Sequence, residues 1–136
     1  MLSLARKLSI GEKMHYQISN IDDIADITFQ GNLNAFDLLF MLQSQEYKTT
    51  IHTYKKILID YTQVDGVTLT PEDIKSLTLL SRIDLEKLGT INIVLVVDED
   101  EQKLVKSVTE SLFSASKSNV QVVDSRDNAM KILNKT

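Results

Sequence analysis

The side chains best suited to chemistry in this sequence are acids that follow an apolar run. The run INIVLVV, residues 91–97, is followed by four consecutive acids: Asp98, Glu99, Asp100 and Glu101. A shorter apolar run at 57–59 is followed by Asp60. If both runs are parallel strands, Asp60 and Asp98 lie at the same edge of the sheet. Carboxylates placed in this way could bind Mg²⁺, which prefers oxygen ligands and keeps several waters.

A structural interpretation competes with metal binding and is the one we favour. Asp98 is well placed to cap the helix that follows it, with Glu101 at the third helical position. Asp60 is placed to accept hydrogen bonds from loop amides. We therefore expect no metal, no cofactor and no catalytic residue.

The segment 91–108 also resembles the start of a phosphorelay receiver domain. That family requires paired acids after its first strand, an acceptor aspartate after its third and a lysine after its fifth. Only residues 92–136 remain from this point, and their pattern indicates one further strand. The receiver fold cannot be completed from this start, so we reject the resemblance.

The length and composition predict a single soluble domain. The chain has 136 residues, of which 43% are hydrophobic and 25% are charged, and no apolar run reaches the roughly 20 residues of a membrane helix. A net charge of −4 without a basic stripe argues against a nucleic-acid partner. Cysteine is absent, which excludes disulfides and thiol chemistry and fits the cytoplasm. We see no signal-peptide pattern at the start.

The first half of the chain predicts a hairpin, a helix and a strand. Alternating apolar residues at 14–19 and 24–30 are separated by turn chemistry and predict two antiparallel strands. Asn34 is a good cap for an apolar helix that we expect to run to about Glu46. The run 57–59 predicts a strand covered on both faces.

The second half predicts three helices alternating with two strands. The sequence Thr70-Pro71-Glu72-Asp73 is the strongest helix start, and we expect that helix to reach about Leu88. A strand at 91–97 and a helix through Leu104 to Leu112 follow. A strand at 120–123 precedes a final helix capped by Asp124 or Ser125. The order β-β-α-β-α-β-α-β-α implies a mostly parallel sheet with crossover helices and an antiparallel strand at one edge.

Three further features have both a functional and a structural interpretation. His15 and His52 have no catalytic or metal-ligand spacing around them, so we expect structural or solvated roles. Phe36, Phe40 and Met41 could line a small apolar pocket, although a plain core explains them better. Residues 1–12 mix Leu and Ile with Arg6 and Lys7; we expect them to pack on the domain or on a second subunit, rather than to form a membrane-surface helix.

Read as a whole, the sequence resembles the STAS-like family, bacterial relatives of the sporulation anti-sigma-factor antagonist. The resemblance runs from about Tyr16 to Leu133. Its motifs are a glycine-x-leucine helix entry, a central strand ending in aspartate, a second helix start, and the closing strands and helix. They correspond here to GNLNAFDL at 31–38, ILIDY at 57–61, LTPEDI at 69–74, residues 93–97 and 120–123, and Asp127-Asn128-Ala129 with Leu133.

The resemblance implies a regulatory interaction domain without catalytic residues, acting alone or as a homodimer. Members of this type bind a partner kinase and are switched by phosphorylation of a serine that follows an aspartate. This sequence has no aspartate–serine pair between Val64 and Pro71. The resemblance also implies a partner surface, at the loop 62–70 and the start of the second helix. Its candidate regulatory or partner-facing residues are Asp60, Val67, Thr68, Leu69 and Thr70.

Within that group, Thr70 and Thr68 are the candidates for phosphorylation. Thr70 is already explained as a helix cap, and Glu72 and Asp73 would repel an added phosphate.

The alternative function, from another class, is a binder or carrier of a small apolar ligand or lipid. A closed cavity above about 300 Å³ would favour that alternative, whereas a filled core with an exposed apolar patch near Val67 and Leu69 would favour a protein partner.

Overall fold

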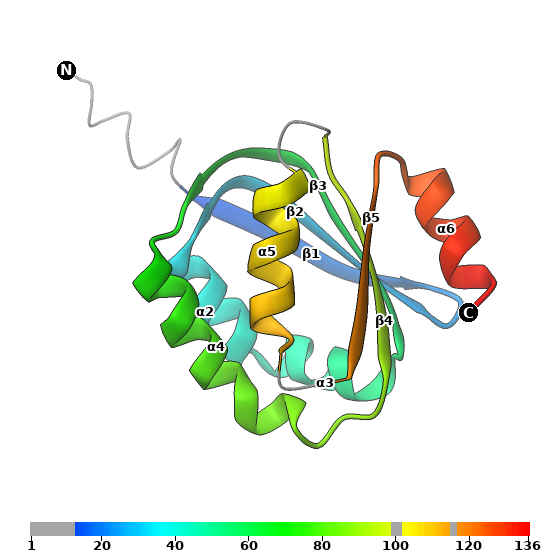
Figure 1. Cartoon of the computed structure of the whole chain (residues 1–136), viewed down its shortest axis with the longest axis horizontal. Helices are drawn as coiled ribbons and strands as arrows, with labels where there is room; N and C mark the ends of the chain where they lie inside the picture. The colour runs from blue at the N-terminus through cyan, green and yellow to red at the C-terminus, as the bar shows by residue number, and fades with distance from the viewer. Residues whose placement is uncertain (1–12, 99–101, 115–116) are drawn as a thin grey trace.

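The computed structural model describes residues 13–98, 102–114 and 117–136. One five-stranded sheet forms the centre, with strand order β1-β2-β3-β4-β5; β1 is antiparallel to β2 and every other neighbouring pair is parallel (Figure 1). The predicted mixed α/β sheet with an antiparallel edge strand is confirmed. The elements are β1 (Met14–Ile21), β2 (Ile24–Asn34), α2 (Ala35–Gln43), α3 (Gln45–Thr53), β3 (Lys56–Thr68), α4 (Pro71–Leu85), β4 (Ile91–Val96), α5 (Gln102–Leu112), β5 (Ser118–Val123) and α6 (Arg126–Asn134).

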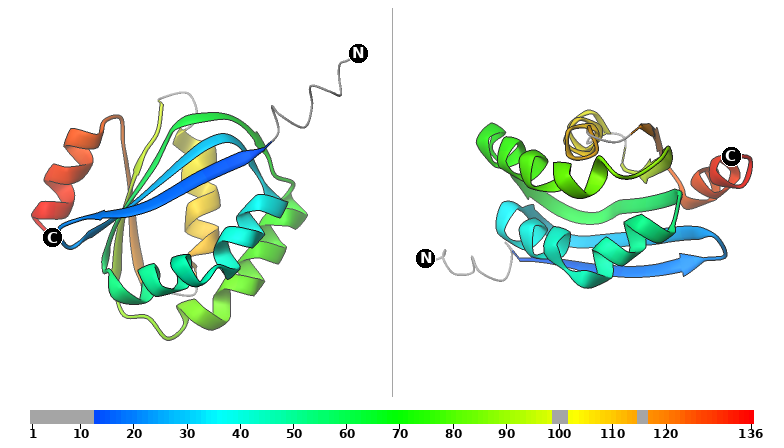
Figure 2. Two further views of the ribbon diagram at one scale, coloured as in Figure 1. Left: turned by 180° about the vertical axis from the view of Figure 1, so that it is seen from behind. Right: turned by 90° about the horizontal axis from the view of Figure 1, so that it is seen from below.

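The two faces of the sheet are covered unequally. The larger core cluster joins one face of the strands to apolar residues of α2, α3, α4 and α5. On the other face, Ile24, Leu58 and Val94 pack with Ala129 and Leu133 of α6. Figures 1 and 2 show α6 standing apart from the other helices, beside the β4–β5 side of the sheet. The continuous apolar strands β3 and β4 follow from this arrangement, because both of their faces are buried.

The hairpin forms where alternation and turn residues predicted it. Met14 pairs with Gly31 at one end and Ile21 pairs with Ile24 at the other. Asp22 has a φ of 53°, and the side chain of Asn20 donates to the Asp22 carbonyl oxygen at 3.2 Å. Aspartate tolerates this left-handed conformation better than most residues, which suits a two-residue hairpin loop.

Helix capping also agrees with the sequence at three of the helices. Thr70 and Asp73 form a reciprocal capping box at the start of α4, with Pro71 at the first helical position. Asn34 caps α2 through the backbone amide of Asp37. Of the two candidates for the last helix, Ser125 is the cap, since its hydroxyl accepts from the amide of Asn128.

Three expectations about the middle of the chain are wrong. The helix predicted to reach Glu46 stops at Gln43, because Ser44 has an extended backbone, and a further helix, α3, then begins at Gln45. The strand predicted at 57–59 continues to Thr68, so most of the expected loop 62–70 is strand paired with β2. The second helix ends at Leu85, before the expected Leu88.

Two other expectations concern residues beyond the described ranges. The expected packing of residues 1–12 lies outside the described structure. Glu99, Asp100 and Glu101 also lie outside the described residues, so the expected capping of α5 by Asp98 and Glu101 is not described either.

Candidate functional site

An open hollow lies where the ends of β2 and β3 meet the start of α2. Its volume is about 480 Å³. It contains Thr68, one of the residues that the sequence singled out, together with residues of β2 and α2. The lining residues are Lys13, Asn32, Asn34, Ala35, Phe36, Asp37 and Thr68.

Gly31 allows the chain to form this hollow. Its φ is +81°, and a Cβ at this position would lie 2.3 Å from the carbonyl oxygen of Lys13. The same carbonyl oxygen accepts a hydrogen bond from the amide of Asn32 at 3.1 Å. Only glycine combines this conformation with so close an approach. A Cβ at Gly66 would lie 2.9 Å from the Asn32 side-chain oxygen, so that side chain would have to shift.

Asp37 fastens the first described residues to the start of α2. One carboxylate oxygen accepts from the Met14 amide at 2.9 Å and from the side-chain amide of Asn34 at 2.8 Å. Burial acts to raise the pKa of Asp37, but the hydrogen bonds from Met14 and Asn34 and the positive charge of Lys13 outweigh it. The pKa of Asp37 therefore lies below its usual value.

The four neighbouring candidates at the start of α4 divide into two kinds. Val67 and Leu69 are half-buried and pack against the larger core cluster. They therefore do not form the exposed apolar patch that would have favoured a protein partner. Thr68 and Thr70 are exposed. The Thr68 hydroxyl accepts from the side-chain amide of Asn32, whereas the Thr70 hydroxyl accepts from the Asp73 amide at 3.0 Å.

Asp60, the remaining candidate, is buried inside the domain and does not face solvent. It is 4% exposed, and one carboxylate oxygen accepts from the amide and hydroxyl of Thr62 at 2.9 and 2.7 Å. The other oxygen accepts from Arg126 at 2.9 Å. Burial acts to raise the pKa of Asp60, but the hydrogen bonds from Thr62 and the guanidinium of Arg126 lower it below its usual value.

Arg126 is the residue that sequence reasoning missed. Its guanidinium bridges Asp60 and Asp26, which is 7% exposed, and so joins the start of α6 to β2 and β3. Hydrogen bonding to Asp26, and also to Asp60, raises the pKa of Arg126. One signal was present in the sequence: Asp26 stands between Ile24-Ala25 and Ile27, with apolar residues on both sides. A buried acid there requires a cationic partner.

The metal hypothesis receives no support from the geometry around Asp60. Both of its carboxylate oxygens already accept hydrogen bonds from Thr62 or Arg126. Asp98 is exposed at the end of β4. Within the described ranges, no group of three or more His, Cys, Asp or Glu side chains could hold a metal ion. His15 and His52 are exposed on β1 and α3.

The apolar residues of α2 do not line one enclosed pocket, nor do they all belong to the core. Phe36 and Phe40 are 68% and 63% exposed, whereas Met41 is 3% exposed within the core. The buried side of α2 is formed by Leu38, Met41 and Leu42. This corrects the expectation for Phe36 and Phe40, which lie on the outer side of the helix.

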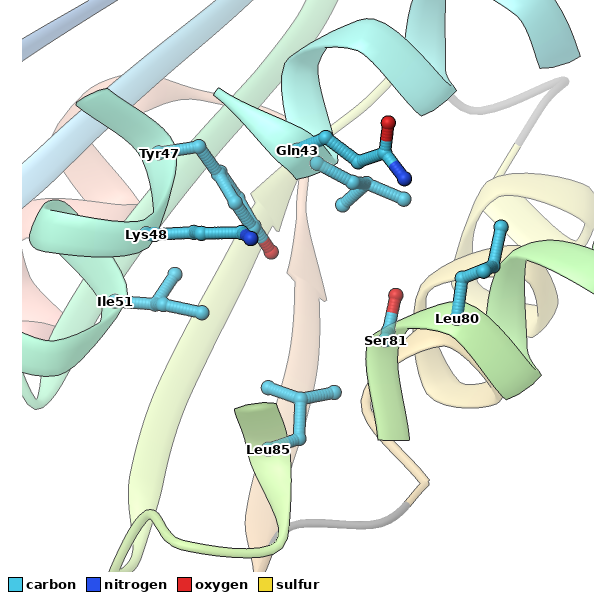
Figure 3. A pocket seen from close by; sticks show the side chains of 8 residues that line it. Gln43, Tyr47, Lys48, Ile51, Leu80, Ser81 and Leu85 are labelled. Atoms are coloured by element: carbon cyan, nitrogen blue, oxygen red, sulfur yellow. The ribbon is translucent and has the colours of Figure 1, made fainter. Parts of the chain in front are cut away.

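A small pocket lies instead between α2, α3 and α4 (Figure 3). Tyr47 and Ile51 of α3 face Leu80 and Leu85 of α4 across it. Its volume is about 70 Å³, well below the roughly 300 Å³ that ligand pockets normally reach. This pocket therefore gives no support to a carrier of a lipid or another apolar ligand. Among the helices of the described residues, none has the length and apolarity to span a membrane.

Comparisons with known proteins bear on the fold. No protein-family model matches the sequence, and no curated protein matches it significantly. Two solved structures are similar over most of the chain. An uncharacterized DUF3478-family protein with a SpoIIAA-like fold from Shewanella loihica PV-4 has a TM-score of 0.57 and 16% identity, over 88% of this chain and 93% of that one. An anti-sigma factor antagonist from Mycobacterium paratuberculosis has a TM-score of 0.53 and 12% identity, over 90% and 95%.

These similarities extend along nearly the whole chain, as the sequence motifs did. At such low identity they establish the architecture and leave the activity open. Together with the strand order and the helix positions, they show that this chain has the STAS-like fold.

Proposed function

We propose that this protein is a non-enzymatic regulatory domain that acts by binding a protein partner. The observation that carries the proposal is the open hollow of about 480 Å³ beside Thr68. Its lining combines a cation, an acid, two amides, a hydroxyl and an exposed aromatic ring. Protein interfaces use this mixture of an aromatic anchor and polar groups. One of the structural neighbours is an anti-sigma factor antagonist, which supports a regulatory role.

The partner-facing surface that we propose consists of Thr68, Thr70, Phe36 and the rest of the hollow. Thr68 and Phe36 both line the hollow, and both are exposed. Val67 and Leu69 support this surface from below, since both pack against the core. Asp60 does not contact the partner in this proposal. Its ion pair with Arg126 stabilises the fold.

Affinity capture from the native host with two matched variants tests the proposal. Thr68→Arg places a long cation in the hollow, and Gln17→Arg makes the same kind of change at an exposed position of β1. We expect the wild type and Gln17→Arg to recover a stoichiometric protein and Thr68→Arg to lose it. Circular dichroism confirms that both variants fold. Recovery of a stoichiometric lipid with no protein would overturn the proposal.

Thr68 is the better of the two candidate phosphorylation sites. A phosphate on Thr70 would break the capping box and place a dianion beside Asp73. Thr68 is exposed, makes no capping interaction and lines the hollow, so a phosphate there would change the charge of the partner surface. Intact-mass measurement on protein from the native host, grown under several conditions, tests this; the absence of any phosphorylated fraction would contradict it.

A further inference from the structure

The surface between α2 and α4 holds an apolar groove that the proposed function does not explain. We call it the α2/α4 groove; its volume is about 310 Å³ and it is open to solvent. Its lining is mainly apolar, with contributions from both helices: Ala35, Phe36 and Leu39 of α2, and Asp73, Ser76, Leu77 and Leu80 of α4.

Phe36 and Leu80 line this groove and are well exposed, and Phe40 lies beside Phe36. Phe36, Phe40 and Leu80 are 68%, 63% and 51% exposed. The rings of Phe36 and Phe40 contact each other edge to face, with centroids 4.9 Å apart. Monomeric proteins seldom leave a contiguous apolar surface of this kind uncovered unless something binds there.

Acidic residues border the groove. Asp73 lines the groove itself, and Glu72 precedes it in the first turn of α4. Asp37 lines the adjoining hollow, which shares Ala35 and Phe36 with the groove. A segment that combines apolar side chains with positive charge is complementary to this surface.

The first twelve residues of the chain have that chemistry. Their sequence is MLSLARKLSIGE, in which leucines and an isoleucine surround Arg6 and Lys7. The segment joins the described structure at Lys13, which lines the same hollow as Phe36. The next residue, Met14, donates its amide to Asp37 in the first turn of α2. The segment is therefore covalently attached beside the hollow that adjoins the groove.

Its length is sufficient to reach the whole groove. Twelve residues span about 18 Å as a helix and up to about 40 Å when extended. The nine residues of α2 are about 14 Å long by the same measure.

We propose that residues 1–12 bind in the α2/α4 groove of the same chain. Their apolar side chains cover Phe36, Phe40 and Leu80, and Arg6 and Lys7 meet the acidic border. The placement of residues 1–12 goes beyond the proposed function. Only its regulatory consequence, competition with a partner, rests on that function. Because the groove and the partner surface share Phe36, a bound segment competes with the partner.

Paramagnetic labelling tests the placement directly, because the chain has no cysteine. A nitroxide on Ser3→Cys in the full-length, ¹⁵N-labelled protein broadens amide signals that come close to it. We expect Phe40, Ser76 and Leu80 to lose most of their signal. Leu104 on α5 is the matched control, since it is 50% exposed and not part of the groove. Equal broadening at Leu104, or none at the groove, overturns the proposal.

Variants and a mixing experiment exclude other occupants. Leu80→Asp should abolish the broadening at Phe40 and Ser76, whereas Leu104→Asp should leave it unchanged. In a mixture of nitroxide-labelled ¹⁴N protein with unlabelled ¹⁵N protein, we expect no broadening. Broadening of the groove signals in that mixture would show that the segment of a second copy fills the groove. A third outcome is that the groove signals do not broaden and the signals of residues 1–12 disappear only when phosphatidylglycerol vesicles are added. That outcome would assign the segment to a membrane surface. Both results overturn the proposal.

The outcome is independent of the proposed function. If the groove signals do not broaden but affinity capture still depends on Thr68, only the placement of residues 1–12 fails. If the groove signals broaden but no protein is captured, only the interaction function fails.

Discussion

Replacing Arg126 with methionine is the sharpest test of how α6 is held to the sheet. Arg126→Met keeps the apolar stem but leaves Asp26 and Asp60 buried without a cation. Breaking a buried ion pair costs about 3–5 kcal/mol. Two features reduce that figure: the Arg126 side chain is 40% exposed, and Asp60 keeps its hydrogen bonds from Thr62. We expect the free energy of unfolding to fall by about 2–3 kcal/mol at neutral pH.

The pH dependence of this loss has a definite sign. The folded-state pKa of Asp60 lies below its unfolded value. Its stabilising contribution is therefore present above the unfolded pKa of about 3.9 and is lost as the pH falls through the folded pKa. Without Arg126, burial favours the neutral acid. The difference in stability between wild type and Arg126→Met should be largest near pH 7 and should shrink as the pH falls toward about 4.

Urea unfolding followed by far-UV circular dichroism measures both effects. The matched control is Arg82→Met, because Arg82 forms an exposed pair with Glu86 at 3.9 Å; we expect it to change stability by no more than about 0.5 kcal/mol. If the loss for Arg126→Met equals that of the control, or stays constant between pH 7 and about 4.5, the assigned role of Arg126 is refuted.

Three further predictions concern single side chains. Gly31→Ala should destabilise the domain by more than about 1 kcal/mol in urea unfolding, because its Cβ would meet the Lys13 carbonyl oxygen. Gly89→Ala, with nothing within 4 Å of its added Cβ, is the control, and equal losses would contradict the steric argument. Thr70→Ala removes the capping box and should raise hydrogen exchange in the first turn of α4, at a cost of about 0.5–2 kcal/mol; unchanged exchange would count against it. Burial raises the pKa of Tyr61 to about 12, so the folded state should lose stability as the pH rises above about 10; Tyr61→Phe should remove that part of the alkaline loss.

The sequence predicted those elements that are determined by residues close together in the chain. The alternation of Met14, Tyr16 and Ile18 was sufficient for β1, because one face of that strand meets the core and the other meets solvent. The start of α4 was equally readable, since Thr70 and Asp73 satisfy each other's backbone amides within a single turn.

The helix break at Ser44 was hidden by the composition of α2. Six of its nine residues are aliphatic or aromatic, so the periodicity did not reveal which side would be buried. The end of the helix then depends on Ser44, whose hydroxyl donates to the Met41 carbonyl oxygen and accepts from the Tyr47 amide. One side chain thus ends α2 and begins α3. The exposure of Phe36 and Phe40 was not predicted for the same reason.

The contacts around the candidate site could not be predicted from the sequence. Thr68 was expected in a loop before the second helix, but it is the last residue of β3. The bond between Thr68 and Asn32 joins residues 36 apart, and Arg126 meets Asp26 at a separation of 100 residues. Such contacts depend on strand register and on the path of the final helix. No local pattern contains that information.

The sequential strand order has a consequence for how the chain folds during synthesis. Since the order in the sheet equals the order in the sequence, no strand has to insert between two that are already paired. A nascent chain leaving the ribosome can add β3, β4 and β5 in turn to one growing edge. The buried acids Asp26 and Asp60 emerge well before their arginine. Until α6 is complete, they remain accessible to water on an uncovered face, so their desolvation has to wait for that helix.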